Sequence, residues 1–272
     1  MFSAFHIPFM QKALIISLIT GGFLSFLGVY IVLRRIVFVG IALSQITACG
    51  FAFGFLLSIN PSICAVIFTL IGVILFSVRQ TEKKIPDESV IGLAYALASS
   101  LGILFIAKSA QAETHILNLL SGSILTVTDS QIYVALIVFS LCGLFHYLFY
   151  KQFIFISFDS ETAATTGLNI QLWNFIFYLI LGIVISTSIK ASGVILTFGY
   201  MVIPSIIALL IVRNMKKVFF ISVIFGLIAT LFGLYLSFVL DLPSGPTIVT
   251  ILCILLGLSL LIKEVWTLIY SR

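Results

Sequence analysis

Residues 13–33 read ALIISLITGGFLSFLGVYIVL, a run without a single charged side chain. The adjacent Arg34 and Arg35 follow this run directly. A helix that crosses the hydrocarbon core of a bilayer needs about 20 mainly apolar residues, and this run is long enough. The stretch therefore predicts a membrane-spanning helix that ends at two cationic side chains.

The composition of the whole chain also indicates a membrane protein. Of its 272 residues, 61% are hydrophobic and only 8% are charged, whereas an ordinary soluble domain has about 25% charged residues. The mean hydropathy is +1.29. A soluble fold could not bury that much apolar surface, so this composition excludes the soluble, secreted, disordered and nucleic-acid-binding classes.

Interruptions of the apolar pattern divide the chain into eight or nine predicted spans. The number stays open because only residues 190–193, KASG, separate the sixth span from the seventh. No connection is long enough for a separate domain, so we expect one all-α membrane domain over residues 1–272. The predicted spans are about 11–33, 36–57, 62–78, 89–107, 131–150, 171–189, 192–212, 218–240 and 246–262.

The basic residues indicate the orientation, because lysine and arginine resist translocation. The chain has 14 of them and 9 acidic residues, a net charge of +5. With the N-terminus outside, 11 basic residues lie on the inner side and the remaining 3, Lys12, Lys108 and Lys190, lie outside. This division predicts a multi-pass protein of the cytoplasmic membrane with residues 79–88 and 151–171 inside.

Cysteine labelling can check this topology. A cysteine at position 83, in place of Lys83, should stay unreactive toward an impermeant thiol reagent in intact cells and react once the membrane is opened. A cysteine in place of Lys108 should react in intact cells. Labelling of position 83 from outside would overturn the whole orientation.

The motifs of nucleotide and zinc chemistry are absent from the sequence. A phosphate-binding loop needs a glycine followed by lysine, and no glycine here is followed by lysine. The histidines, His6, His115 and His146, are far apart, and the four cysteines stand singly in apolar stretches. We therefore expect no bound cofactor, no catalytic residue and no ATP hydrolysis by this chain itself.

The inner connection after the fifth span has the signals of a short helix over about 160–166. Asp159 is a good N-cap residue, and Glu161 would lie in the first turn, where the helix dipole favours an anion. Gly167 can adopt the left-handed conformation that ends a helix. Such a helix is either an ordinary surface connector or a surface that a permease presents to an ATPase.

The same segment resembles a known family. Residues 157–161, SFDSE, followed by Gly167 and Leu168, are similar to the F-D-P-E-x-A-x-x-x-G-L coupling segment in permeases of zinc, manganese and iron ABC importers. Ser160 replaces the usual proline, a mild change in the first turn of a helix. Three more stretches agree in order: 27–35 leading to GIALS at 40–44, 192–196 leading to Pro204, and 241–247.

The resemblance implies a function and partners. The chain would be the permease subunit of an importer for a divalent transition metal, its transported substrate, with Asp159, Ser160, Glu161 and Gly167 coupling it to the ATPase. A separate cytoplasmic ATPase would hydrolyse ATP, and an extracytoplasmic metal-binding protein would deliver the cargo. A second permease copy, identical or different, would complete the membrane part, and no nucleic acid would be involved.

The second span departs from the family pattern. Where the family reads G-D-A-L-S-H, with an aspartate and a histidine thought to contact the metal, this chain has Ile41 and Gln45. Ile41 cannot ligate a metal, and Gln45 offers only a neutral carbonyl oxygen. The pathway therefore binds metal weakly, or takes ligands from a different partner permease, or carries another substrate.

Several polar residues remain as candidates. Ser44, Gln45, Thr47 and Cys49 either line the translocation pathway or hydrogen-bond neighbouring helices. Glu113 and His115 lie in an outer segment where a binding protein could deliver cargo, or are simply solvated. The alternative functions are an importer of non-metal or chelated cargo and a membrane-embedded enzyme; enzymes of that kind generally have acidic or histidine clusters. We also expect Gly21, Gly22 and Gly28 to allow close helix contacts, and Pro204 to kink its span.

Overall fold

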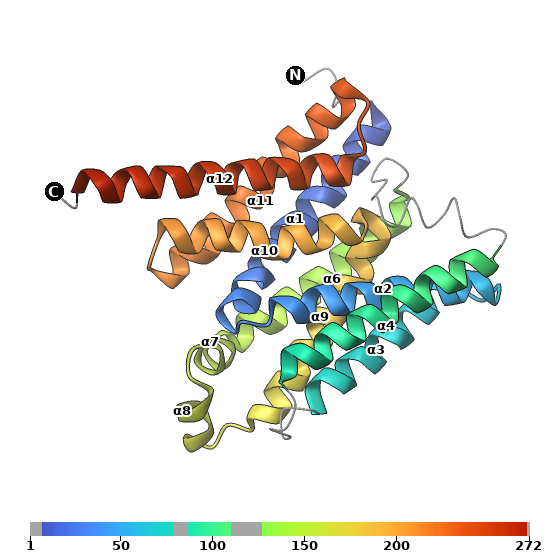
Figure 1. The fold of residues 1–272 in the computed structure, drawn as a ribbon, viewed down its shortest axis with the longest axis horizontal. Helices are drawn as coiled ribbons and strands as arrows, with labels where there is room; N and C mark the ends of the chain where they lie inside the picture. Colours follow the sequence, from blue (N-terminus) through green and yellow to red (C-terminus); the bar gives the residue numbers. More distant parts are fainter. Residues whose placement is uncertain (1–6, 79–85, 110–126, 271–272) are drawn as a thin grey trace. The chain divides into compact units, whose positions relative to one another are not determined.

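The structure, a computed structural model, describes residues 7–78, 86–109 and 127–270. Within these ranges the regular structure is entirely helical (Figure 1). The helices are α1 (Pro8–Leu33), α2 (Val37–Leu56), α3 (Pro61–Val78), α4 (Asp87–Lys108), α6 (Asp129–Leu148), α7 (Tyr150–Phe158), α8 (Ser160–Thr165), α9 (Ile170–Ser192), α10 (Val194–Ile211), α11 (Met215–Leu240) and α12 (Ser244–Tyr270).

The predicted all-α polytopic membrane fold is confirmed. In the described part of the chain, eight helices are long and apolar enough to cross a membrane, and α3 is a shorter apolar helix over Pro61–Ser77. The sixth and seventh predicted spans are separate helices, because α9 ends at Ser192 and α10 begins at Val194. Gly193 joins them at φ 81°, a conformation that side chains with a Cβ rarely adopt.

One predicted loop and one predicted boundary are wrong. The fifth span was expected to run to residue 150 and to continue as a loop, but α6 ends at Leu148 and Tyr150–Phe158 form α7. The last span was expected to end near 262, but α12 continues to Tyr270. Lys263 and Glu264 end the apolar pattern without ending the helix, since both are good helix formers.

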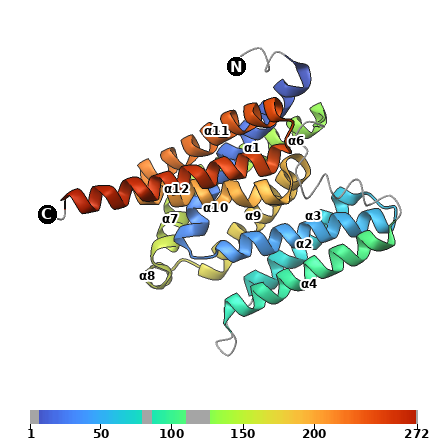
Figure 2. The same cartoon turned by 45° about the horizontal axis from the view of Figure 1, so that its top comes forward.

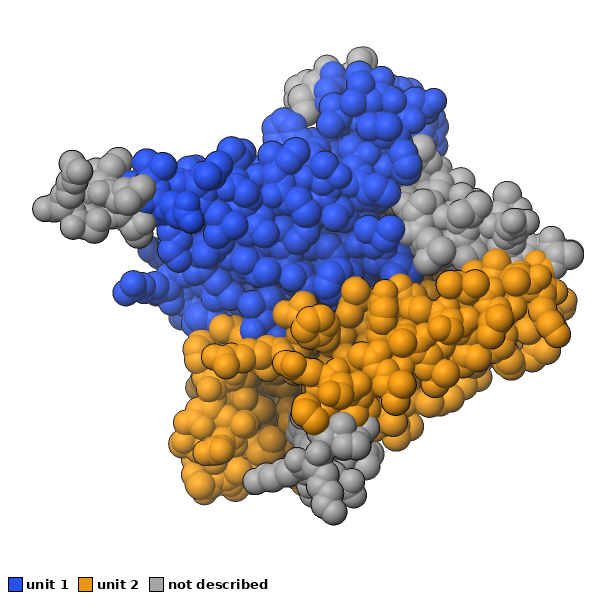
Figure 3. Space-filling view, in the orientation of Figure 1, with its two compact units in different colours: residues 1–32, 121–135, 191–272 blue, residues 33–120, 136–190 orange. Residues whose placement is uncertain are grey.

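The chain divides into two compact units by its internal contacts (Figure 3). Unit 1 consists of Met1–Val32, Ser121–Ala135 and Ala191–Arg272, and unit 2 of Leu33–Leu120 and Leu136–Lys190. Among the described residues, unit 1 holds nearly all of α1, the start of α6, and α10 to α12. Unit 2 holds α2 to α4, the rest of α6, α7 and α8, and nearly all of α9. That residues 1–272 act as one domain stays a prediction.

Small residues and hydroxyls hold unit 1 together. A Cβ at Gly28 of α1 would lie 1.8 Å from the carbonyl oxygen of Met201 on α10, and one at Gly21 would lie 2.9 Å from the Tyr200 ring. The Ser222 hydroxyl of α11 donates to the Ser25 carbonyl of α1 at 2.8 Å. The prediction of close contacts is confirmed at Gly21 and Gly28. At Gly22 the nearest side-chain atom, 3.6 Å away on Leu227, is at ordinary contact distance.

In unit 2, α2 packs against both α3 and α4 (Figure 2). Gly50 and Gly54 allow the close approach of α3: a Cβ at these positions would lie 2.7 Å from the Ala65 Cα and 2.5 Å from the Pro61 Cα. Thr69 of α3 connects two neighbouring helices through its hydroxyl, 2.7 Å from the Thr47 hydroxyl of α2 and 2.9 Å from that of Ser186 on α9. The small residues thus bring the helices close enough for their hydroxyls to pair.

Other helices present apolar side chains outward. The most apolar windows of α4, α6 and α12 are 17%, 22% and 22% buried, against 61% for each of α1, α2, α9 and α10. Leu93, Ile103 and Ile137 are among the exposed apolar side chains. A helix with its backbone groups bonded internally and apolar side chains outside is stable against lipid. The outer surfaces of these helices therefore suit a bilayer.

Candidate functional site

Helix α8 begins at a capped N-terminus. Its Asp159 carboxylate accepts a hydrogen bond from the backbone N–H of Thr162 at 2.9 Å and another from the Thr162 hydroxyl. Glu161 lies in the first turn, where the helix dipole favours a negative charge. The predicted short helix is confirmed, with Asp159 as its N-cap.

The C-terminus of α8 closes with a Schellman motif. The Gly167 N–H donates to the Ala164 carbonyl at 3.1 Å, and the Leu168 N–H donates to the Ala163 carbonyl at 3.4 Å. Gly167 has φ 87°, and a Cβ there would meet no atom within 4 Å. The position therefore favours glycine for its backbone conformation and not for lack of space.

Most of α8 is exposed, and Ala163 is the one buried residue of the helix. The side-chain hydrogen bond from Thr162, supported by backbone hydrogen bonds, holds the pKa of Asp159 below its ordinary value. The cap is therefore ionised throughout the neutral range. A capped helix with nearly all of its surface exposed is well suited to bind another protein.

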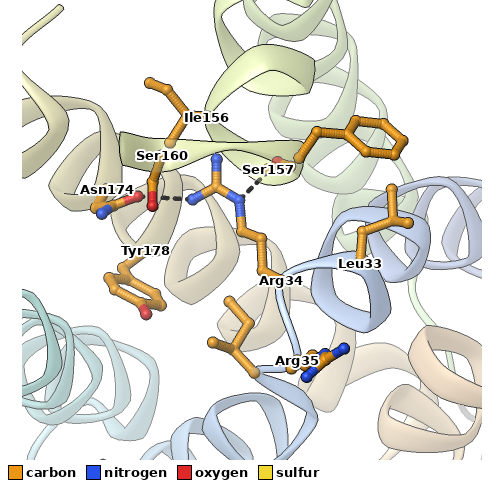
Figure 4. A pocket seen from close by; sticks show the side chains of 10 residues that line it. Leu33, Arg34, Arg35, Ile156, Ser157, Ser160, Asn174 and Tyr178 are labelled. Carbon is orange, nitrogen blue, oxygen red and sulfur yellow. Dashed lines mark hydrogen bonds between the residues drawn. The ribbon is translucent and has the colours of Figure 1, made fainter. Parts of the chain in front are cut away.

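A hollow of about 210 Å³ lies beside α8 within unit 2 (Figure 4). It brings together the end of α1, the last turn of α7, the first residue of α8 and one face of α9. Its lining residues are Leu33, Arg34, Arg35, Ile36, Ile156, Ser157, Phe158, Ser160, Asn174 and Tyr178.

Arg34 lies at the centre of this hollow. Its Nε donates to the Ser157 hydroxyl at 2.8 Å, and its Nη1 donates to the Asn174 side-chain oxygen at 2.8 Å. The guanidinium carbon lies 4.2 Å from the centre of the Phe177 ring, within the range of a cation–π contact. Arg34 thus connects the end of α1 to α7 and α9.

Sequence reasoning used Arg34 as the end of the first span, as a sign of orientation and as part of a family motif, and it missed this role. The partners are 123 and 140 positions away along the chain, so no local spacing indicates them. The signal that was present is the placement of an arginine at the end of a span, where a charge near the bilayer usually finds a polar partner.

On α2, one of the predicted pathway residues, Thr47, contacts a neighbouring helix, and another, Ser44, bonds within α2. The Ser44 hydroxyl donates to the Gly40 carbonyl at 2.9 Å. The Thr47 hydroxyl donates to the Leu43 carbonyl and contacts Thr69, as described above.

The other two candidates on α2 differ in burial. Cys49 is buried, and its Cα lies 3.7 Å from the position of a Cβ at Gly102 of α4. Ile41 and Gln45, at the positions where the family has metal-contact residues, are half-buried. A pathway role for Ser44, Gln45, Thr47 and Cys49 stays a prediction.

Within the described ranges there is no group of three or more histidine, cysteine, aspartate or glutamate side chains that could hold a metal ion. Glu113 and His115 lie outside the described residues. His146 is fully buried; its ring stacks on Phe153 at 4.3 Å, and its Nδ1 lies 3.2 Å from the Cys142 carbonyl oxygen.

Comparison with known proteins agrees with the fold. The chain is 28% identical over 268 residues to the manganese transport system membrane protein MntC of Listeria monocytogenes, covering 97% of this chain and 94% of the relative. It is 28% identical over 247 residues to a probable iron transport system membrane protein of Haemophilus influenzae, covering 91% and 87%. Among solved structures, a chain of PsaBC from Streptococcus pneumoniae, determined in complex with a Fab, superimposes with a TM-score of 0.85 at 26% identity and 95% coverage of both chains.

The family profile described as the ABC 3 transport family matches residues 6–263. This match covers nearly every described helix and confirms the predicted family, while the coupling role of residues 159–167 stays a prediction. The chain therefore belongs to the ABC 3 transport family and is a membrane-embedded transport subunit.

Proposed function

We propose that this chain is the permease of an ATP-binding-cassette importer that takes up a divalent transition metal ion. The observation that carries the proposal is α8, a capped and exposed helix between two spans of a chain that manganese and iron transport membrane proteins match almost from end to end. Its working partners are a cytoplasmic ATPase, an extracytoplasmic metal-binding protein and a second permease copy.

In this proposal the chain contributes energy transduction and the ATPase contributes the chemistry. The sequence has no phosphate-binding loop, so ATP binds to the partner. Asp159 and Gly167 fix the two ends of α8, and Ser160 and Glu161 present its first turn to the ATPase. The chain is accordingly no enzyme, and its substrate crosses the membrane unchanged.

The cargo we favour is manganese or iron and not zinc. The relatives are named for manganese and iron, and the position where the family has histidine holds Gln45. An amide oxygen suits a hard cation such as Mn²⁺ better than Zn²⁺, which prefers nitrogen and sulfur ligands. With Ile41 in place of the aspartate, contact with the ion is weak, as fast passage requires.

A second candidate is import of a chelated or non-metal cargo. Ile41 and Gln45 favour it, because a cargo that brings its own ligands needs neither a carboxylate nor an imidazole from the pathway. The two candidates differ in the cargo, which is a free metal ion in the first and a chelated metal or a non-metal compound in the second.

Reconstitution tests the proposed function. The chain should be purified with the ATPase that copurifies with it and placed in vesicles with a manganese-loaded binding protein outside. We expect ATP-dependent uptake of Mn²⁺ by the complex, and no ATP turnover by the isolated chain. Uptake of a metal chelate with no uptake of free Mn²⁺ would establish the second candidate. ATP turnover by the isolated chain would contradict the division of labour.

A further inference from the structure

Arg34 and Arg35 are neighbours with opposite environments. Arg35 has φ 58°, a left-handed conformation, in the short connection between α1 and α2. Figure 4 shows the Arg34 side chain directed toward Ser157 and Asn174, and the Arg35 side chain directed away from them. Arg35 is exposed, whereas Arg34 is half-buried. Two neighbouring residues therefore carry the same guanidinium group, and of the two it is Arg34 that bonds to other helices.

The contacts of Arg34 depend on the shape of its side chain. A guanidinium is planar and holds its N–H groups in a fixed fork. Here two arms of the fork meet acceptors on different helices, Ser157 of α7 and Asn174 of α9, and the carbon between them lies 4.2 Å from the Phe177 ring centre. An ammonium group cannot fill this arrangement with the same geometry, because it is a point charge at the end of a flexible chain.

The acceptor on α7 is itself held in place. The Ser157 hydroxyl donates its proton to the Phe153 carbonyl, which leaves its lone pairs available to Arg34. Phe153 is fully buried and packs on His146 and on Trp173, with ring centres 4.3 and 5.4 Å away. The end of α7 is therefore held by the aromatic cluster through Phe153 and by Arg34 through Ser157.

This fixed turn leads directly into α8. Ser157 stands two residues before Asp159, which ends α7 and caps α8. Helix α8 has only six residues and buries only Ala163, and so short a helix has little stability of its own. Its direction is therefore set by what precedes it. Ser160, its first residue, also lines the hollow around Arg34.

We propose that Arg34 is the positioning residue of α8, joining the end of α1 to α7 and α9 so that the short helix keeps one orientation toward its ATPase. The role belongs to the fork of the guanidinium and not to its positive charge. This inference rests on the proposed function, since it assigns how the coupling surface is held.

Arg34→Lys in the complex with the ATPase is the central test, because it keeps the charge and removes the fork. We expect hydrogen exchange of the backbone amides of residues 160–168 to become about tenfold faster, as lost side-chain hydrogen bonds lower the cost of local opening. ATPase stimulation by the loaded binding protein should fall about tenfold per complex. Arg35→Lys, the same change one residue away, should leave both readouts as in the wild type.

Ser157→Ala tests the same contact from the acceptor's side. It removes one acceptor and leaves Arg34 in place, so it should accelerate exchange in 160–168 by a smaller factor. Combined with Arg34→Lys, it should add little, because both changes remove the same contact.

Three outcomes would overturn the inference. They are wild-type exchange and stimulation in Arg34→Lys, equal losses in Arg35→Lys, and faster exchange throughout α2 to α4, which would indicate a general loss of unit 2. Failure of the proposed function is distinguishable from these. A wild-type complex that imports no metal would refute that function, while the exchange of 160–168 would still report on Arg34.

Discussion

Gly28→Ala is expected to prevent accumulation of the folded chain. The added methyl group would lie 1.8 Å from the carbonyl oxygen of Met201 and 2.6 Å from the Ser205 hydroxyl. The Met201 oxygen belongs to the backbone of α10, so no side-chain rotation relieves the contact and α1 must move away. Overpacking of a close contact typically costs about 1–3 kcal/mol and occasionally more, and a contact with the backbone lies at the upper end of this range. Separating α1 from α10 also strains the hydrogen bond from the Ser205 hydroxyl to the Ser25 carbonyl.

The measurement is the amount of monodisperse protein extracted from membranes, together with its melting temperature in detergent. Gly92→Ala is the matched control, since a Cβ at Gly92 of α4 would meet no atom within 4 Å and should leave both values unchanged. Normal extraction and melting of Gly28→Ala would show that α1 and α10 are not packed as closely as described.

The combined variant Asp159→Ala, Gly167→Val is expected to abolish ATPase stimulation and uptake while the chain accumulates normally. Loss of the N-cap costs about 0.5–2 kcal/mol. Valine at φ 87° adds roughly 1–2 kcal/mol of backbone strain and disrupts the Schellman motif. A six-residue helix cannot absorb both losses. Membrane insertion should survive, because neither residue lies in a spanning helix.

The assay is stimulation of ATP hydrolysis in reconstituted vesicles by the loaded binding protein. Asp159→Asn should keep most of the stimulation, because asparagine caps a helix about as well as aspartate. Asp129→Ala removes a carboxylate at the start of α6 whose ion pair with Lys12 is exposed, and such a pair contributes little stability; stimulation should remain. Full stimulation in the combined variant would make 160–168 an ordinary connector.

The same cap sets a pH dependence. The pKa of Asp159 is lower in the folded chain than in an unfolded one, so its stabilising effect is present above the unfolded pKa and is lost as the pH falls through the folded pKa. Across the neutral range the carboxylate stays ionised, and stimulation should not titrate through Asp159 there.

The spans and the caps of α8 could be predicted because their signals are local. Apolar runs of sufficient length define the spanning helices, and Asp159 and Gly167 act on backbone groups within a few residues of themselves. The sequence did not predict α7, because Lys151 and Gln152 interrupt the apolar pattern. The helix forms there because Phe153 packs on rings from α6 and α9.

The partners of Arg34 could not be predicted either, because they are distant from it along the chain. Ser157 and Asn174 are ordinary residues in their own surroundings, and only the folded chain brings them to the guanidinium. The contact of Thr47 with a neighbouring helix was among the predicted alternatives, whereas Ser44 donates to a carbonyl of its own helix. Such a contact could not be predicted without the positions of the neighbouring helices, since a hydroxyl on a span serves a cavity or a neighbour equally well.

The hydroxyl contacts between the helices have a consequence for motion. Thr47 and Thr69 touch each other across α2 and α3, yet each also has a carbonyl four residues earlier on its own helix, Leu43 at 2.8 Å and Ala65 at 2.6 Å. Ser205 of α10 likewise has Met201 in reach besides Ser25. If these helices separate, each hydroxyl can keep its hydrogen bond to the carbonyl of its own helix, so no buried hydroxyl donor loses its acceptor. These pairs of helices could therefore separate and come together again at small enthalpic cost, which suits the transport role proposed above.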